Sequence, residues 1–197
     1  MRVKLLKILA LHGKGSSPAK IKWLTEPLKE FGQVDAPNVE MEADEFLNEF
    51  LNKEYDLVAG HSRGGTYALL YAANKGVPVI AVSAPSDRIL QLNYLSTFKQ
   101  GTFQKNAYED LKNLSYEYLK RTSPIAYADR IKKALLIHGT KDETVPLEQS
   151  KKMCEAILKS GGSCNLHELE MKHTPPASLY RTVNKIIKDW VIKNVEL

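Results

Sequence analysis

The chain has 197 residues, of which 43% are hydrophobic and 26% charged, so we expect one domain over residues 1–197. Its apolar runs fall short of the roughly 20 residues that cross a bilayer, and Lys7 interrupts the opening segment, which lacks a small-residue cleavage site; we therefore expect a cytoplasmic protein that does not bind membranes. The net charge of +5 comes from scattered lysines without basic and aromatic runs, which argues against a nucleic-acid partner.

Apolar runs and helical patterns alternate along the chain. Strands are predicted at residues 3–11, 33–36, 55–60, 77–83, 134–138 and 165–170. Helices are predicted at residues 21–31, 43–51, 66–73, 147–158 and 178–191. Continuous apolar strands separated by helices predict an α/β fold with a mostly parallel sheet of about six strands, covered by helices on both faces. In such a sheet, functional groups gather on the loops at the carboxyl ends of the strands.

One of these loops carries the motif Gly60-His61-Ser62-Arg63-Gly64, between an apolar strand and a helix-forming run. A serine at the tip of a sharp strand-to-helix turn is a typical hydrolase nucleophile. The residues two before and two after it must be small, because strand and helix approach each other there. Gly60 and Gly64 meet this requirement, so we predict Ser62 as the nucleophile.

A serine hydroxyl needs a neighbouring base, and imidazole is the best matched side chain. The chain offers His12, His61, His138, His167 and His173. His12 and His138 precede glycines at strand ends, and neither is favoured as the base. His61 adjoins the nucleophile but would point away from it, and His167 lies inside the last strand. His173 follows that strand on a loop, so we predict it as the base.

The imidazole in turn needs a carboxylate that fixes its tautomer. Asp142 lies in the loop after the strand at 134–138, and we predict it for this role. Glu143 is the nearest alternative, but its position one residue later turns it away from the side that Asp142 faces. Asp87, Asp110 and Asp129 lie in the long segment before that strand or close to it.

The order Ser62, Asp142, His173, with His12-Gly13 after the first strand and the stretch His138–Pro146 ahead of a helix, resembles the α/β-hydrolase family over essentially the whole chain. The chain is more narrowly similar to small carboxylesterases, to dienelactone-hydrolase-like proteins and to the catalytic domain of prolyl oligopeptidase-type peptidases. Dienelactone hydrolase itself uses a cysteine nucleophile, so Ser62 favours general ester chemistry.

The resemblance implies a three-layer α/β-hydrolase fold without the first two strands of larger members, and neither a cofactor nor a metal. It assigns His12 and His138 to turn scaffolding. It also implies an oxyanion hole formed by the backbone N–H groups of Lys14 and Arg63. Their basic side chains either play no part or favour anionic substrates, and we expect the former. In this family a lid often follows the fourth strand, where residues 86–127 would form a short helical lid. Its apolar side chains are expected partly to line an acyl pocket and partly to pack the insertion.

We therefore predict a serine hydrolase that cleaves small-molecule carboxylic esters of short to medium acyl chains through an acyl-enzyme, as a monomer or homodimer. A thioesterase, a small peptidase and a catalytically silent interaction module of the same fold are the alternatives. Cys154 and Cys164 lack metal-ligand spacing. Free thiols are expected for them, with a single disulfide as the alternative.

Overall fold

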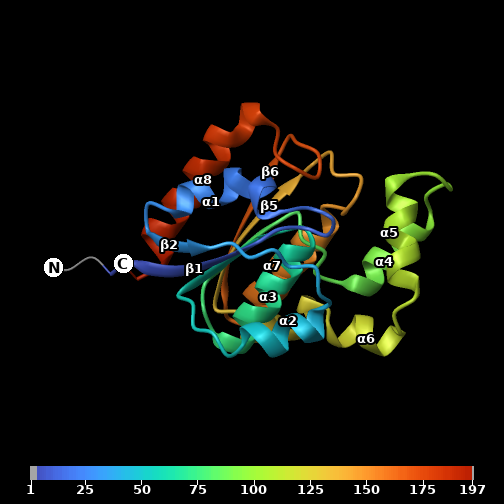
Figure 1. Cartoon of the computed structure of the whole chain (residues 1–197), viewed down its shortest axis with the longest axis horizontal. Helices are drawn as coiled ribbons and strands as arrows, with labels where there is room; N and C mark the ends of the chain where they lie inside the picture. The colour runs from blue at the N-terminus through green and yellow to red at the C-terminus, as the bar shows by residue number, and fades with distance from the viewer. Residues whose placement is uncertain (1–3, 197) are drawn as a thin grey trace.

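The computed structural model describes residues 4–196 and contains a six-stranded parallel sheet between two layers of helices (Figure 1). The strands are β1 (Leu6–Leu11), β2 (Gly32–Asp35), β3 (Leu57–His61), β4 (Val79–Val82), β5 (Lys133–Gly139) and β6 (Ser163–Leu169). Their order in the sheet is β2-β1-β3-β4-β5-β6, and every neighbouring pair is parallel. The predicted α/β fold is confirmed. The first predicted strand begins at Leu6, and Val3 lies outside the described residues.

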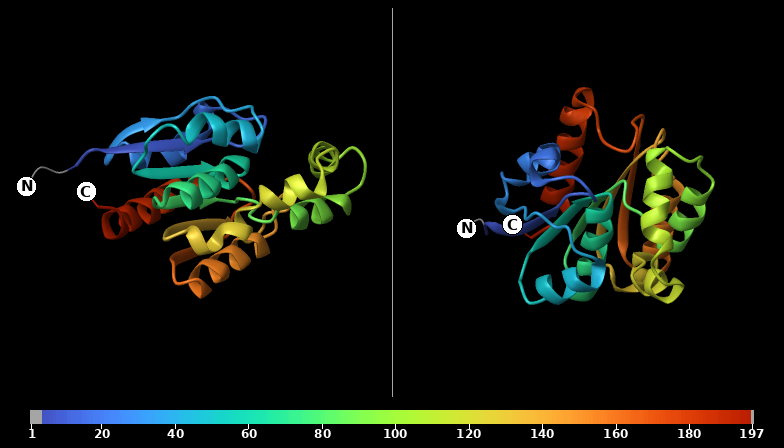
Figure 2. Two further views of the ribbon diagram at one scale, coloured as in Figure 1. Left: turned by 90° about the horizontal axis from the view of Figure 1, so that it is seen from below. Right: turned by 45° about the vertical axis from the view of Figure 1, so that its right-hand side comes forward.

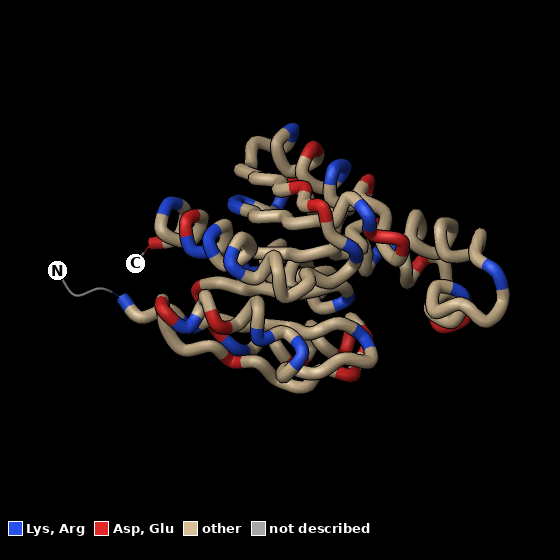
Figure 3. The backbone as a smooth tube through the Cα atoms, turned by 90° about the horizontal axis from the view of Figure 1, so that it is seen from above, with Lys and Arg blue, Asp and Glu red and all other residues tan. Residues whose placement is uncertain are grey.

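The predicted helices are present within a few residues of their expected ends. They are α1 (Lys22–Leu28), α2 (Ala43–Phe50), α3 (Arg63–Lys75), α7 (Glu148–Lys159) and α8 (Tyr180–Asn194). Three further helices, α4 (Arg88–Ser96), α5 (Phe103–Lys112) and α6 (Tyr116–Arg121), lie in the segment where a helical lid was expected without individual bounds. Short 3₁₀ helices lie at Pro18–Ile21, Pro124–Arg130 and Ala177–Leu179. Within residues 4–196, no helix has the length and apolar character needed to cross a membrane. Basic and acidic residues are interspersed along the backbone (Figure 3).

The sheet separates two hydrophobic cores, which explains why its central strands are apolar throughout. Successive residues of a strand point to opposite faces. Leu9 of β1 therefore packs in the core under α2, α3 and α7, whereas Ile8 packs in the core under α1 and α8. Both side chains are fully buried. This rigid sheet holds the loops at its carboxyl edge in fixed positions.

The segment between β4 and β5 forms three helices, α4 to α6, which we call the cap segment (residues 88–121). It stands off from the sheet on the side where the strands end (Figure 2). Leu95 of α4 and Leu119 of α6 are buried, but α5 contains no buried residue. The cap segment occupies the interval 86–127 in which a helical insertion was predicted.

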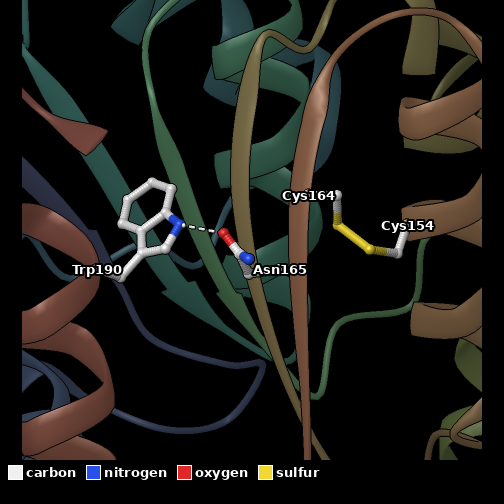
Figure 4. The surroundings of a disulfide bond; sticks show 4 residues. All are labelled: Cys154, Cys164, Asn165 and Trp190. Atoms are coloured by element: carbon white, nitrogen blue, oxygen red, sulfur yellow. Dashed lines mark hydrogen bonds between the residues drawn. A yellow bond between two sulfur atoms is a disulfide. The ribbon is translucent and has the colours of Figure 1, made fainter. Parts of the chain in front are cut away.

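The expectation of free cysteines was wrong, because Cys154 of α7 and Cys164 of β6 form a disulfide (Figure 4). Helix α7 packs against β6, which brings the two Cα atoms to 5.5 Å, within the range that a disulfide spans. The next residue of β6, Asn165, points to the opposite face, where its Oδ1 accepts a hydrogen bond of 3.1 Å from Nε1–H of Trp190. The bridge lies near the start of β6, at the other end of the strand from the carboxyl edge.

Candidate active site

Ser62 occupies a sharp turn between β3 and α3, with φ 55° and ψ −124°. A positive φ is strained for a residue other than glycine, and such strain is concentrated at functional sites. The flanking glycines permit the turn: a Cβ on Gly60 would lie 2.1 Å from the Gly64 carbonyl oxygen, and one on Gly64 would lie 2.2 Å from that of Leu11. Strand and helix could not approach this closely with any larger residue, so the sequence motif forms the turn that it predicts.

The three residues predicted as nucleophile, base and acid come together at the carboxyl edge. Nε2 of His173 lies 2.9 Å from Oγ of Ser62, and its Nδ1 lies 2.8 Å from Oδ2 of Asp142. A carboxylate only accepts hydrogen bonds, so Nδ1 carries the imidazole proton and Nε2 is free to accept the serine hydroxyl. This arrangement can activate a serine oxygen for attack on a carbonyl carbon.

Asp142 is buried and accepts several hydrogen bonds. Its Oδ1 accepts from the backbone N–H groups of Thr144 and Val145, each at 2.9 Å, while Nε2 of His138 lies 3.3 Å from Oδ2. Burial by itself would raise the pKa of the Asp142 carboxyl, but the bonds from His138, His173 and Val145 outweigh it and hold that pKa well below its usual range. The carboxylate therefore stays ionised in neutral and mildly acidic solution.

Two other histidines hold the loops around the site. Nδ1–H of His12 donates to the Gly13 carbonyl at 2.7 Å, while its Nε2 accepts from the Val39 N–H at 2.9 Å. Nε2–H of His138 is shared between the Val145 carbonyl oxygen at 2.8 Å and Oδ2 of Asp142 at 3.3 Å, and its Nδ1 lies 2.7 Å from the Ser150 hydroxyl. Both rings are buried and hold these loops, as the resemblance to α/β-hydrolases implied.

The remaining two histidines differ sharply. His167 is exposed on the edge strand β6 and has no place in the site. His61 is buried, and its Nε2 lies 2.9 Å from the backbone carbonyl oxygen of His173. Burial, with the charge of His173 adding to it, lowers the pKa of His61 to about 4. Sequence reasoning missed this contact, since no local pattern marks a partner 112 residues away.

A cavity of about 500 Å³ opens above Ser62 and His173. Its outer wall is the inner face of the cap segment, with the side chains Leu95, Phe103, Ala107, Leu111 and Leu114. Leu119 is buried away from this wall, so the insertion both lines the cavity and packs on itself. The charged side chains of Glu42 and Arg88 also border the cavity.

The loop after β1 and the start of α3 lie on either side of Ser62. A Cβ on Gly13 would be 3.2 Å from Cβ of Ser62. Within residues 4–196, no hydrogen bond uses the backbone N–H of Lys14 or of Arg63. The Lys14 ammonium pairs with Asp110 of α5 at 2.8 Å, and the Arg63 guanidinium bonds the Val39 carbonyl. The N–H groups are thus free to bind a ligand, while both cations have partners within the protein.

The sequence of the chain matches a known protein family. The model of the prolyl oligopeptidase family matches residues 6–174, which covers most of the chain and all three residues of the Ser62, Asp142 and His173 arrangement. The chain belongs to the prolyl oligopeptidase family. No curated protein sequence matches it. The similarity to prolyl oligopeptidase-type proteins expected from the sequence is confirmed.

Several solved structures are similar in fold to this chain over nearly its whole length. A monoacylglycerol lipase from Paleococcus ferrophilus is 17% identical with a TM-score of 0.65, covering 95% of this chain and 94% of that one. An esterase from Pyrococcus furiosus is 16% identical with a TM-score of 0.66, covering 96% and 83%. An acylaminoacyl peptidase from Pyrococcus horikoshii is 16% identical with a TM-score of 0.70, covering 99% of this chain but 38% of that one. These similarities confirm the α/β-hydrolase fold. The prolyl oligopeptidase family and this fold together indicate a serine hydrolase.

Proposed function

We propose that this protein is a serine carboxylesterase for small esters with short to medium acyl chains, and that Ser62, His173 and Asp142 are its catalytic triad. The observation that carries the proposal is the hydrogen-bonded chain from Asp142 through His173 to Ser62, at the base of a cavity. An interaction module without activity would not need a strained serine aligned with a base, which argues against the silent alternative.

The geometry supports a two-step reaction. Oγ of Ser62 attacks the ester carbonyl carbon while Nε2 of His173 takes its proton, and Asp142 stabilises the resulting imidazolium. As the tetrahedral intermediate collapses, the bond to the leaving alkoxide breaks and His173 returns the proton to it. Water then attacks the acyl-enzyme with His173 again as the base, which releases the acid and regenerates Ser62.

The N–H groups of Lys14 and Arg63 would bind the oxyanion of each intermediate. His12 supports this role for Lys14, because its bond to the Gly13 carbonyl fixes the orientation of the peptide between residues 13 and 14. In a trans peptide the C=O and N–H point in opposite directions. The Lys14 N–H is therefore directed away from His12, on a loop that contacts Ser62.

Two observations favour esters over peptides. The cap segment contributes five apolar side chains to the cavity wall beside the polar Gln91, Asn106 and Asp110, and this apolar part suits an acyl chain. The volume of the cavity is that of a small-ligand site. The chain also matches nearly the whole length of a lipase and most of an esterase but only 38% of a peptidase. Membership in a peptidase family makes a small peptidase the second candidate. A thioesterase would use the same residues on a different leaving group.

A substrate panel tests the proposal. The purified protein is given p-nitrophenyl esters of increasing acyl length, matched thioesters, and acylated amino-acid p-nitroanilides. We expect kcat/KM to be highest for esters of fewer than about ten carbons, because a cavity of about 500 Å³ bounded on one side by the cap segment suits a short to medium acyl chain. Preferential cleavage of the anilides would show that the protein is a peptidase. Cleavage of none of the esters, thioesters or anilides would reject the assignment as a hydrolase.

A further inference from the structure

His61 is buried between two aromatic rings and has an unusual polar contact. The ring centroids of Trp23 and His173 lie 5.4 Å and 5.0 Å from its own. Its Nε2 lies 2.9 Å from the His173 carbonyl oxygen and 3.5 Å from Oγ1 of Thr174. A carbonyl oxygen cannot donate, so Nε2 of His61 carries a proton and donates it to this bond.

This bond fixes the backbone of a loop that makes few other backbone hydrogen bonds. Residues 170–176 follow β6 without helix or strand. The loop is fixed as far as Lys172 by Gly139, where a Cβ would lie 2.2 Å and 2.4 Å from the carbonyl oxygens of Met171 and Lys172. Among the described residues, the bond from His61 is the only hydrogen bond made to the backbone of residues 172–175. The loop carries His173, whose ring must reach Asp142 and Ser62 at once.

We propose that His61 is a positioning residue for His173, and that it acts by donating Nε2–H to the His173 backbone carbonyl. This inference rests on the proposed function for its effect on catalysis. The immediate neighbour of the nucleophile thus also fixes the base. Because His61 adjoins Ser62 in the chain, one residue couples the positions of the two groups between which the proton moves.

The protonation state of His61 fits this role. With its pKa lowered to about 4, the ring is neutral at pH 7, and the bond to the carbonyl selects the tautomer with the proton on Nε2. A neutral neighbour also avoids repelling the imidazolium that forms on His173 during the reaction. A cation at this distance would oppose that charge.

Two substitutions of similar size separate donation from packing. His61→Gln keeps an N–H donor near the position of Nε2, whereas His61→Met fills similar space without a donor. We expect kcat of the Met variant to fall by about tenfold to a hundredfold, the loss typical of a small displacement of a catalytic group, while KM changes less than about twofold. The Gln variant should stay within about threefold of the wild type. His61→Asn is a second test, because its donor is too short to reach the carbonyl.

The leaving group adds a readout that loss of stability would not change. An alkoxide must receive its proton from His173, whereas p-nitrophenolate leaves without one. The Met and Asn variants should therefore lose several-fold more activity on an ethyl ester than on the p-nitrophenyl ester of the same acid. Equal kcat values for the Gln and Met variants on both substrates would overturn the proposal.

A spectroscopic readout keeps the test independent of turnover. The His173 Nδ1–H in its bond to Asp142 gives a low-field proton resonance, which we expect in the wild type and the Gln variant and not in the Met variant. If the wild type cleaves no ester but the resonance still requires the donor, the proposed function fails and the positioning role stands. If the wild type cleaves esters and the resonance is the same in all variants, the positioning role alone is rejected.

Discussion

The carboxyl edge of the sheet and the cap segment face each other across one cavity but are built differently. At the edge, Asp142 and His138 are buried, and backbone atoms approach so closely around Gly60 and Gly64 that no side chain fits. In the cap segment, α5 has no buried residue, and Phe103 is 68% exposed although it lines the cavity.

This difference assigns separate tasks to the two regions. Chemistry needs atoms held to within fractions of an ångström, and a network of buried hydrogen bonds supplies this at the edge. A helix that contributes one face to a cavity and buries nothing can change its sequence at little cost in stability. We infer that the edge determines the reaction and that the cap segment selects the substrate.

The largest expected effect comes from the nucleophile. Ser62→Ala should reduce kcat by about 10⁴-fold to 10⁶-fold and abolish labelling by a fluorophosphonate, because no other group can form the acyl-enzyme. Turnover of a p-nitrophenyl ester and mass spectrometry of the labelled protein measure both. His173→Ala should cause a comparable loss, and His167→Ala on the exposed edge of β6 is the matched control. An active Ser62→Ala variant, or a His167→Ala variant as inactive as His173→Ala, would contradict the assignment.

A second effect concerns how the stability of the folded protein depends on pH through His61 at the carboxyl edge. His61 titrates near its ordinary pKa of 6.5 when unfolded and at about 4 when folded, so between these values the unfolded chain binds the extra proton. The free energy of unfolding should therefore fall as the pH drops through this window, by about 2–3 kcal/mol between pH 7.5 and 4.5. His61→Gln removes this contribution. The free energy of unfolding of the variant, measured with urea, should therefore fall by about 2–3 kcal/mol less than that of the wild type between pH 7.5 and 4.5.

Asp142 contributes little to the change in the free energy of unfolding between pH 7.5 and 4.5. Its pKa is lowered on folding, so its contribution to stability is present above the unfolded value near 4 and is lost only as the pH falls further. Parallel losses of stability in the wild type and the Gln variant would show that His61 titrates normally in the folded protein.

Much of the edge could be predicted from the sequence, because each predicted residue carries a local signal. Ser62 lies in a motif whose glycines are required by the turn, and Asp142 and His173 follow strands that the apolar pattern marks. The contacts that were missed join residues far apart in the sequence: His61 with His173, and Lys14 with Asp110. The disulfide was misjudged for the same reason, because its formation depends on how α7 packs against β6.

The disulfide should matter for stability and not for chemistry. It closes a loop between residues separated by 10 positions, for which the loss of chain entropy predicts about 2–3 kcal/mol of stabilisation. Reduction, or replacement of Cys154 and Cys164 by alanine, should lower the free energy of unfolding by this amount. The kcat for a p-nitrophenyl ester should stay unchanged at temperatures where both forms are folded. A lowered kcat would mean that the disulfide end of β6 influences the edge.

The cap segment gives a smaller effect, and one of a different kind. Leu111→Ala removes apolar volume from the cavity wall, so we expect the preferred acyl chain to lengthen and kcat/KM for a longer ester to rise by up to about tenfold relative to a short one. A series of p-nitrophenyl esters measures the shift. Lys112→Ala, an exposed position on the same helix, is the control and should leave the profile unchanged. An equal loss on all esters in Leu111→Ala would mean that the cap segment serves the reaction and not its selectivity.

The smallest effect comes from the pair that joins the two regions. Lys14 carries one proposed oxyanion donor, and its ammonium is paired with Asp110 of α5, with both side chains about half exposed. Such pairs contribute little, so Asp110→Asn should change kcat/KM for a neutral ester by less than about threefold. The unpaired Lys14 ammonium should, however, raise kcat/KM for an ester that carries a carboxylate by a few-fold relative to the neutral ester. Added salt should remove this gain. The double variant Asp110→Asn, Lys14→Gln keeps the N–H and removes the charge, so it should show no preference. If Asp110→Asn gained nothing on the anionic ester, the Lys14 charge would have no access to the substrate, and the pair would serve only to hold α5 against the edge.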